Sequence, residues 1–159
     1  MRRFSLYGFV ISLLWLGFVC ALSFIAAPAK FRALGITDTS VITIELQHAL
    51  RIGSAVFSKL NSIEWICAAF SWFIMWRTSV VRARGSIYVL LLITLILCAQ
   101  TWLFFPALES RTAEILHGHM PPPTWHHLAY MITEIVKALA LGVLAAAQIQ
   151  GFARAVISE

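Results

Sequence analysis

Two long stretches of this chain carry no charged side chain, and they constrain the fold more than any other feature of the sequence. Residues 4–29 and 86–108 contain no Asp, Glu, Lys or Arg. Each stretch exceeds the roughly 18–20 apolar residues that a helix needs to cross the hydrocarbon core of a bilayer. Because lipid offers backbone groups no hydrogen-bond partner, such stretches cross a membrane as helices. The sequence therefore predicts an integral membrane protein.

Two further stretches are nearly free of charge. Residues 60–76 contain only Glu64, and residues 128–151 contain only Glu134 and Lys137. Charged residues make up 12% of the chain, which is about half of the roughly 25% found in soluble domains. We therefore predict one all-α domain over residues 1–159, an integral membrane four-helix bundle with spans at 5–28, 55–76, 86–108 and 125–150.

The net charge of +5 follows the expected topology. Six arginines lie before the first span, between the second and third, or after the fourth: Arg2, Arg3, Arg77, Arg82, Arg84 and Arg154. These segments would share one side of the membrane, and the positive-inside rule makes that side cytoplasmic. The opposite side carries Lys30, Arg32 and Arg51, so the bias is moderate. We expect an inner-membrane protein with both termini in the cytoplasm and no nucleic-acid partner.

A short amphipathic segment is expected between the first two spans. The first span should end near Pro28. In residues 41–52 the apolar side chains recur at helical spacing with polar ones on the other side, which predicts an interfacial helix. Asp38 or Ser40 would cap this helix, and Gly53 would mark its bend into the second span.

Charged residues inside a membrane are the most informative candidates for function, because each costs roughly 2.5–3.5 kcal/mol at a helix centre. Spacings of three, four and three place His127, Tyr130, Glu134 and Lys137 on one face of the last helix. Counting residues from the helix ends puts polar side chains of the other spans, including Ser23 and Thr101, at a similar depth. We therefore predict a buried polar centre formed by Asn61, Glu64, Gln100, Tyr130, Glu134 and Lys137. This centre could be a structural ion pair or a proton or ion site.

The histidines and cysteines are weaker candidates for metal ligands. Histidine-rich tracts can bind transition metals, and five histidines are expected near the outer surface: His48, His117, His119, His126 and His127. Interfacial histidines also occur with no ligand role. Three thiols in different helices could hold a soft metal such as Cu(I) or pack as small apolar groups: Cys20, Cys67 and Cys98. The sequence disfavours a b-type haem, although His48 and His127 could serve as its axial ligands.

The motifs "AAPAKF" at the end of the first span and "FPALESR" at the end of the third resemble those of a family of small four-span proteins. This is the transmembrane protein 205-like family, whose last helix also bears His and Lys. The resemblance implies an integral membrane protein with a loose link to metal or drug tolerance, and it implies no catalytic residues. Its matched positions here are Pro28, Phe31, Pro106, Arg111, His127 and Lys137.

Three functions remain open from the sequence. The first is handling or transport of an ion or metal through the Glu/Lys centre. The second is a non-catalytic membrane scaffold or assembly subunit, as a homodimer or with other membrane subunits. The third is a haem- or quinone-linked subunit. No P-loop, nucleophile elbow or dinucleotide-binding glycine pattern occurs, so the sequence does not favour an enzyme, although Glu, His and Tyr side chains could serve as acid–base groups acting on a lipid or a quinone.

Overall fold

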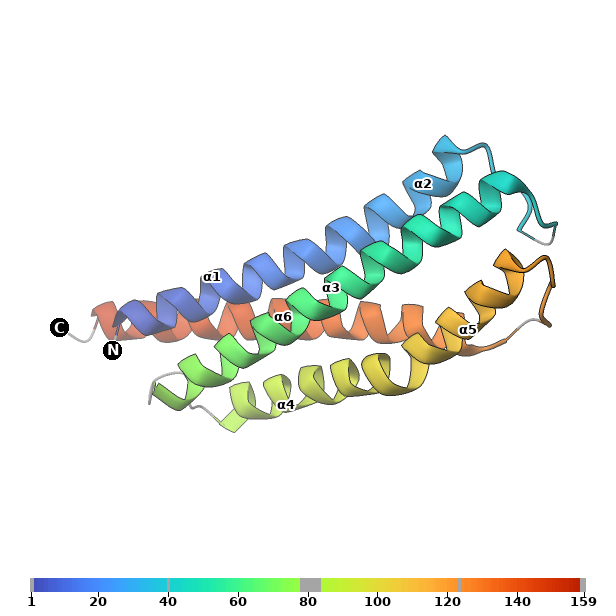
Figure 1. The fold of residues 1–159 in the computed structure, drawn as a ribbon. Coiled ribbons are helices and arrows are strands. Elements are labelled where there is room, and N and C mark those ends of the chain that lie inside the picture. The colour runs from blue at the N-terminus through green and yellow to red at the C-terminus, as the bar shows by residue number, and fades with distance from the viewer. Residues whose placement is uncertain (1, 40, 78–83, 123, 158–159) are drawn as a thin grey trace.

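The computed structural model describes residues 2–39, 41–77, 84–122 and 124–157, and every regular element in these ranges is helical. The described elements form four long helical segments, and segments that follow each other along the chain run in opposite directions (Figure 1). In order they are α1 (Arg2–Val19) continued by the π-helical η1 (Cys20–Ala26) and by α2 (Ala27–Ala33); α3 (Ile44–Arg77); α4 (Arg84–Ala99) continued by the π-helical η2 (Gln100–Phe104) and by α5 (Phe105–Leu116); and α6 (His126–Ile157).

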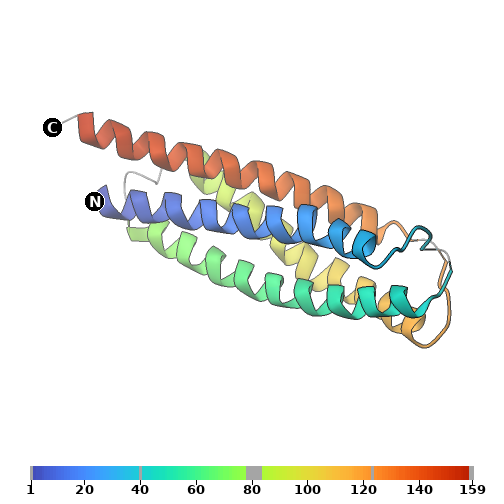
Figure 2. The same cartoon turned by 90° about the horizontal axis from the view of Figure 1, so that it is seen from above.

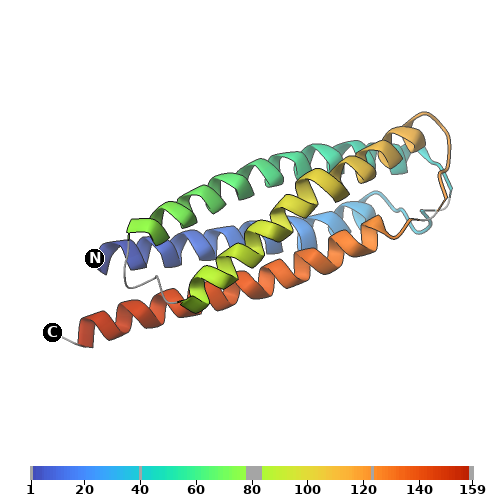
Figure 3. The ribbon, with the colours of Figure 1, turned by 90° about the horizontal axis from the view of Figure 1, so that it is seen from below.

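Both chain termini lie at the same end of the bundle (Figure 1). We call this the terminal end, and we call the opposite end, which holds the connections α2–α3 and α5–α6, the loop end. α1 packs against α6 and α3, and α4 packs against the same two helices. As a result α3 and α6 lie diagonally across the bundle, as Figures 2 and 3 show.

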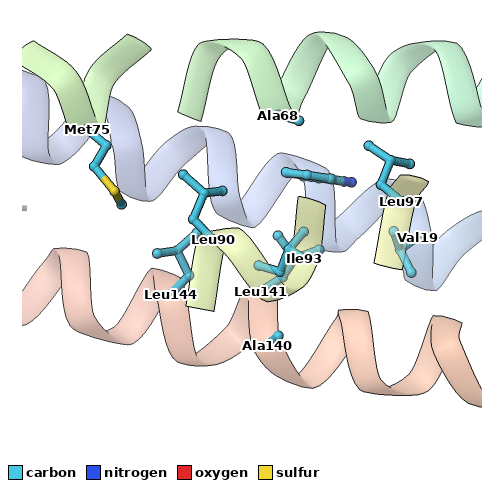
Figure 4. Close-up of a cluster of buried hydrophobic side chains, with 10 residues drawn as sticks. Val19, Ala68, Met75, Leu90, Ile93, Leu97, Ala140, Leu141 and Leu144 are labelled. Atoms are coloured by element: carbon cyan, nitrogen blue, oxygen red, sulfur yellow. The ribbon is translucent and has the colours of Figure 1, made fainter. Parts of the chain in front are cut away.

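The half of the bundle nearer the terminal end has an apolar core. Side chains of α1, α3, α4 and α6 interdigitate there (Figure 4). The members are Trp15, Val19, Ala68, Met75, Leu90, Ile93, Leu97, Ala140, Leu141 and Leu144. This core holds the four segments together on the side of the bundle toward the terminal end.

Many apolar side chains are exposed along the helices, while three charged side chains, those of Glu64, Glu134 and Lys137, are buried in the interior. Leu14, Leu95 and Leu139 are more than half exposed, at 56%, 66% and 68%, whereas Lys137 is 0% exposed. This reversal of the soluble pattern suits a lipid environment. Three helical stretches of the described chain are long and apolar enough to cross a membrane, namely Leu6–Ala33, Gly85–Leu116 and His126–Ala153.

The fourth expected span lies within α3, a 34-residue helix that is not among these three. α3 is less apolar because it carries Lys59, Asn61 and Glu64. An all-helical protein with apolar helices is therefore confirmed, and the three helices counted by length and composition are one fewer than predicted.

The helices continue past the two prolines, and the prediction that the first one ends near Pro28 is wrong. Pro28 and Pro106 each lie in the first turn of the helix that follows a π-helical segment. Proline has no N–H to give to the carbonyl four residues earlier. The residue before each proline instead makes a wider i→i−5 hydrogen bond. Ala27 N donates to the Leu22 carbonyl, and Phe105 N donates to the Gln100 carbonyl. Gly35 and Gly118, with φ of 66° and 85°, end α2 and α5.

The predicted interfacial helix is not a separate element, because residues 44–52 form the first part of α3. Gly53 does not bend the chain; it is buried inside the helix, and a Cβ there would overlap the Lys30 ammonium. The helix is capped by Thr43, whose Oγ1 accepts a hydrogen bond from Leu46 N at 3.1 Å, so the cap is not Asp38. The other predicted cap, Ser40, lies outside the described residues, as does Arg82.

Candidate functional site

Lys137 is at the centre of a buried group of charged side chains. Its Nζ lies 2.5 Å from Glu64 Oε1 and 2.6 Å from Glu134 Oε1, and it donates a hydrogen bond of 2.7 Å to Gln100 Oε1. Glu64 and Glu134 are each 1% exposed. We call Glu64, Glu134 and Lys137 the ion cluster. It joins α3 to α6 across the diagonal of the bundle.

Neutral donors from the remaining segments complete the ion cluster. Trp15 Nε1 of α1 donates to Glu64 Oε1 at 3.0 Å. Ser23 Oγ of η1 donates to Glu134 Oε2 at 2.8 Å, and Gln100 Nε2 of η2 donates to Glu134 Oε1 at 2.9 Å. All four helical segments therefore converge on three charged side chains.

The charges of the ion cluster do not cancel when all three groups are ionised. Two carboxylates and one ammonium leave a net charge of −1 in a place shielded from water. Burial of an ion costs several kcal/mol unless partners offset it, and charge-assisted hydrogen bonds of the kind that Trp15, Gln100 and Ser23 make are the strongest available. The geometry therefore suits a site that can accept one positive charge.

Local helix geometry places these groups. Glu134 and Lys137 are one turn apart on α6, so their side chains meet on one face. Ser23 lies within η1, and Gln100 is the first residue of η2. π-helical turns in α-helices are frequently found at functional sites, and both of the π-helical segments described here contain a side chain that donates a hydrogen bond to the ion cluster.

One residue of the predicted polar centre, Asn61, lies apart from the ion cluster. Asn61 Oδ1 accepts a hydrogen bond from Thr101 Oγ1 at 2.9 Å, and Thr101 Oγ1 also accepts one from Trp65 Nε1 at 3.0 Å. These bonds link α3 to η2. Tyr130, in contrast, lies beside the ion cluster, where its side chain is hydrogen-bonded to Glu134. It is 9% exposed and packs edge-on against Phe57, with 5.9 Å between ring centroids.

The sequence reasoning missed Trp15. Trp15 is not among the predicted site residues, yet its side chain is fully buried and its N–H is bonded to Glu64. The available signal was general: a buried indole N–H usually finds a hydrogen-bond partner. Thr133, which accepts a bond from Gln100 Nε2 at 2.9 Å, was missed as well.

A cavity of about 680 Å³ lies between the ion cluster and the loop end, bordered by η1, α2, α3, α5 and α6. Its walls are apolar and include Phe24, Leu46, Leu50, Phe57, Leu108 and Ile115. Its floor is formed by Ser23, Tyr130 and Glu134, and near the loop end it is bordered by Lys30, Glu109, Arg111 and His127. One carboxylate of the ion cluster, that of Glu134, thus borders a cavity.

The predicted metal ligands do not form a ready-made site. Within residues 2–39, 41–77, 84–122 and 124–157, no group of three or more His, Cys, Asp or Glu side chains could hold a metal ion. His126 stacks on Trp125, with ring centroids 4.5 Å apart. His48, His117, His119 and His127 are exposed, and His127 also borders the cavity.

The three thiols are free and partly buried, with no disulfide between them. Cys20 begins η1, Cys67 lies in α3 three residues after Glu64, and Cys98 lies near the end of α4. Among the described residues, the three thiols therefore do not come together to form a binding site for a soft metal.

The resemblance to the transmembrane protein 205-like family stays a prediction. Four of its matched positions line the cavity, namely Pro28, Phe31, Arg111 and His127, and Lys137 belongs to the ion cluster. In comparisons with known proteins, no family model, no curated protein and no solved structure matches this chain.

Proposed function

We propose that the protein is a four-span membrane protein that moves protons across the membrane by binding and releasing them at the ion cluster, with the cavity as the route of access from the loop end. α3 is taken as the fourth span. Its 34 residues correspond to about 51 Å at 1.5 Å per residue, and it runs beside two of the apolar segments. Its carboxylate at Glu64 is buried inside the bundle, so lipid would not contact that charge.

The orientation proposed is the one that the arginines favour. α3 ends at Arg77 and α4 begins at Arg84, and both positions lie at the terminal end. Arg2 and Arg3 open the chain at this end. The positive-inside rule then assigns the terminal end to the cytoplasm of a cell inner membrane and the loop end to the outer side.

The observation that carries the proposal is the convergence of two carboxylates on one ammonium, with one of the carboxylates at the floor of a cavity. A proton on either carboxylate would cancel the net charge of the ion cluster. Glu134 is the natural entry point because it borders the cavity and because the Ser23 hydroxyl contacts its outer oxygen, Oε2. A hydroxyl can both donate and accept a hydrogen bond.

A proton fits this site better than a metal ion does. The Lys137 ammonium already occupies the space between the two carboxylates, at 2.5 and 2.6 Å from their nearest oxygens. A metal ion would have to displace this ammonium. A proton needs only one carboxylate oxygen and leaves the ion cluster assembled.

Proton uptake into liposomes tests the proposal. Purified protein is reconstituted with an entrapped pH-sensitive dye, and a potassium diffusion potential drives proton entry. We expect the wild type to acidify the lumen and Glu134→Gln to lose this activity. Glu114→Gln, which changes an exposed carboxylate of α5, is the matched control and should behave as wild type. Uptake no faster than in protein-free liposomes, or full activity in Glu134→Gln, would contradict the proposal.

A second candidate is a scaffold in which the ion cluster only locks the helices. It is favoured by the completeness of the hydrogen bonding. Among the described residues, Ser71 Oγ is the single buried side-chain polar atom without a partner, so the polar groups of the ion cluster are satisfied. The liposome assay separates the two candidates, since a structural lock moves no protons.

A further inference from the structure

We propose that the cavity binds a single-chain amphiphile with an anionic head group, such as a long-chain fatty acid, and that Lys30 and Arg111 hold the head group. The proposal rests on the shape and charge of the cavity and does not depend on proton binding at the ion cluster.

Lys30 provides a cation that points into the cavity. The residue is half-buried and lines the cavity from α2. Its ammonium lies 4.9 Å from the centre of the Phe31 ring and against Gly53 of α3, where a Cβ would overlap the Nζ. The ion pairs of the described residues do not include Lys30. Gly53 thus makes room for a partly desolvated cation to which the described chain supplies no carboxylate.

Arg111 adds a second cation at the same end of the cavity. It is partly buried, and one nitrogen of its guanidinium, Nη1, donates to the Pro122 carbonyl. A guanidinium has five N–H donors, so this bond orients the group and leaves donors for a ligand. Glu109 also borders the cavity here; it is exposed and accepts a long hydrogen bond of 3.5 Å from Ser54.

The charge balance around the opening favours an anion. Lys30 and Arg111 contribute +2 and Glu109 contributes −1, which leaves +1 before any charge on His127 is counted. Guanidinium and ammonium groups both bind carboxylates, and a guanidinium can do so through two parallel hydrogen bonds. An organic cation would meet a net repulsion on the way in.

The walls of the cavity select an acyl chain. Between the two cations and the floor the lining is aliphatic and aromatic, with Leu46, Leu50 and Phe57 from α3 facing Leu108 and Ile115 from α5. The volume of about 680 Å³ lies within the roughly 300–1,000 Å³ of small-molecule sites. Glu134 at the floor is 1% exposed and paired with Lys137, so the tail would meet the Tyr130 ring rather than an open charge.

Photolabelling of the detergent-purified, full-length protein tests this site. The probe is a stearic acid with a diazirine near the end of its chain, and labelled peptides are mapped by mass spectrometry. Competitors of equal chain length are oleate, oleyl alcohol and oleylamine, together with oleoyl lysophosphatidic acid. Because the diazirine would lie near the cavity floor, we expect labels at cavity-lining positions near Phe57 and Tyr130. We expect oleate to compete at concentrations about tenfold lower than oleyl alcohol, and oleylamine to compete least. Stronger competition by the lysophosphatidic acid would identify a phosphate rather than a carboxylate head group.

Variants assign the head-group contact. Lys30→Met should weaken oleate binding about tenfold, whereas Lys59→Met, which removes an exposed lysine from α3, should leave it unchanged. Gly53→Ala keeps the charge but displaces the ammonium, and it should also weaken binding. Leu50→Trp fills the cavity and should abolish labelling. Labels outside the cavity, equal competition by the three head groups, or wild-type affinity in Lys30→Met would overturn the proposal. Binding is measured without any proton flux, so each proposal can fail independently.

Discussion

Lys137 shows how a single buried residue organises the interior of this bundle. Its ammonium has three oxygen partners, from α3, η2 and α6, at 2.5–2.7 Å, and the residue is completely buried. A buried ion pair adds little net stability over a well-packed apolar pair, but removal of one member leaves an uncompensated charge. Lys137 therefore matters mainly because of the two carboxylates it separates.

Replacement of Lys137 by Met is expected to destabilise the protein by about 3–5 kcal/mol, because Glu64 and Glu134 would then face each other without a cation. Thermal or denaturant unfolding in detergent measures the effect. The triple variant Lys137→Met, Glu64→Gln, Glu134→Gln removes all three charges and should recover much of the loss. Lys59→Met should be near neutral. A triple variant as unstable as the single one would show that packing, rather than charge, is responsible.

At the scale of elements, the π-helical segments set the positions of two side chains that donate hydrogen bonds to the ion cluster. η1 and η2 each come just before a proline and each end on an i→i−5 bond. Ser23 and Gln100 reach Glu134 from these segments. A regular α-helix through the same residues would rotate these side chains relative to the helices on either side.

Pro106→Ala tests this link because alanine restores an N–H that can bond to the carbonyl four residues earlier and so favours a regular helix. We expect η2 to lose its π-helical turn and Gln100 to lose its contacts. In a double-mutant cycle, Gln100→Ala should therefore cost less in the Pro106→Ala background than in the wild type. Unfolding free energies of the four proteins provide the measurement. Additive costs would mean that Pro106 does not position Gln100.

Thr43 caps α3, and this role is local. Thr43→Ala removes the oxygen that accepts from Leu46 N and should cost about 1 kcal/mol. Hydrogen exchange of the amides in the first turn of α3 should accelerate, while amides near Glu64 should keep their protection. Exchange that rises equally along the whole helix would instead indicate a global loss of stability.

At the scale of the whole molecule, the bundle is polar at its centre and apolar on its surface. The diagonal ion cluster lies between an apolar core toward the terminal end and a cavity toward the loop end. The cavity lies where α2 and α5 follow the two π-helical segments. The ion cluster is therefore accessible through the cavity toward the loop end and is closed by the apolar core toward the terminal end. All four helical segments contribute to this arrangement.

The topology itself can be tested, because four crossings place the termini on one side whereas three would place them on opposite sides. Single cysteines at Met120 and at a residue appended to the C-terminus, in a protein lacking Cys20, Cys67 and Cys98, are labelled in intact cells with a membrane-impermeant maleimide. We expect labelling at position 120 only. A fusion of a cytoplasm-dependent fluorescent protein to either terminus should fluoresce. Surface labelling of the C-terminal cysteine would exclude the proposed orientation.

The sequence by itself determined the all-helical class and the apolar segments, because uncharged runs longer than a bilayer core permit few other folds. It also identified Glu64, Glu134 and Lys137, because charges in such runs are costly and therefore conspicuous. Only the tertiary structure decided that Trp15 joins these charges while Asn61 does not, that the helices continue past Pro28 and Pro106, and that Gly53 lies inside a helix. These features depend on which side chains meet across the bundle and on bonds between neighbouring turns, and composition and spacing along one chain do not determine either.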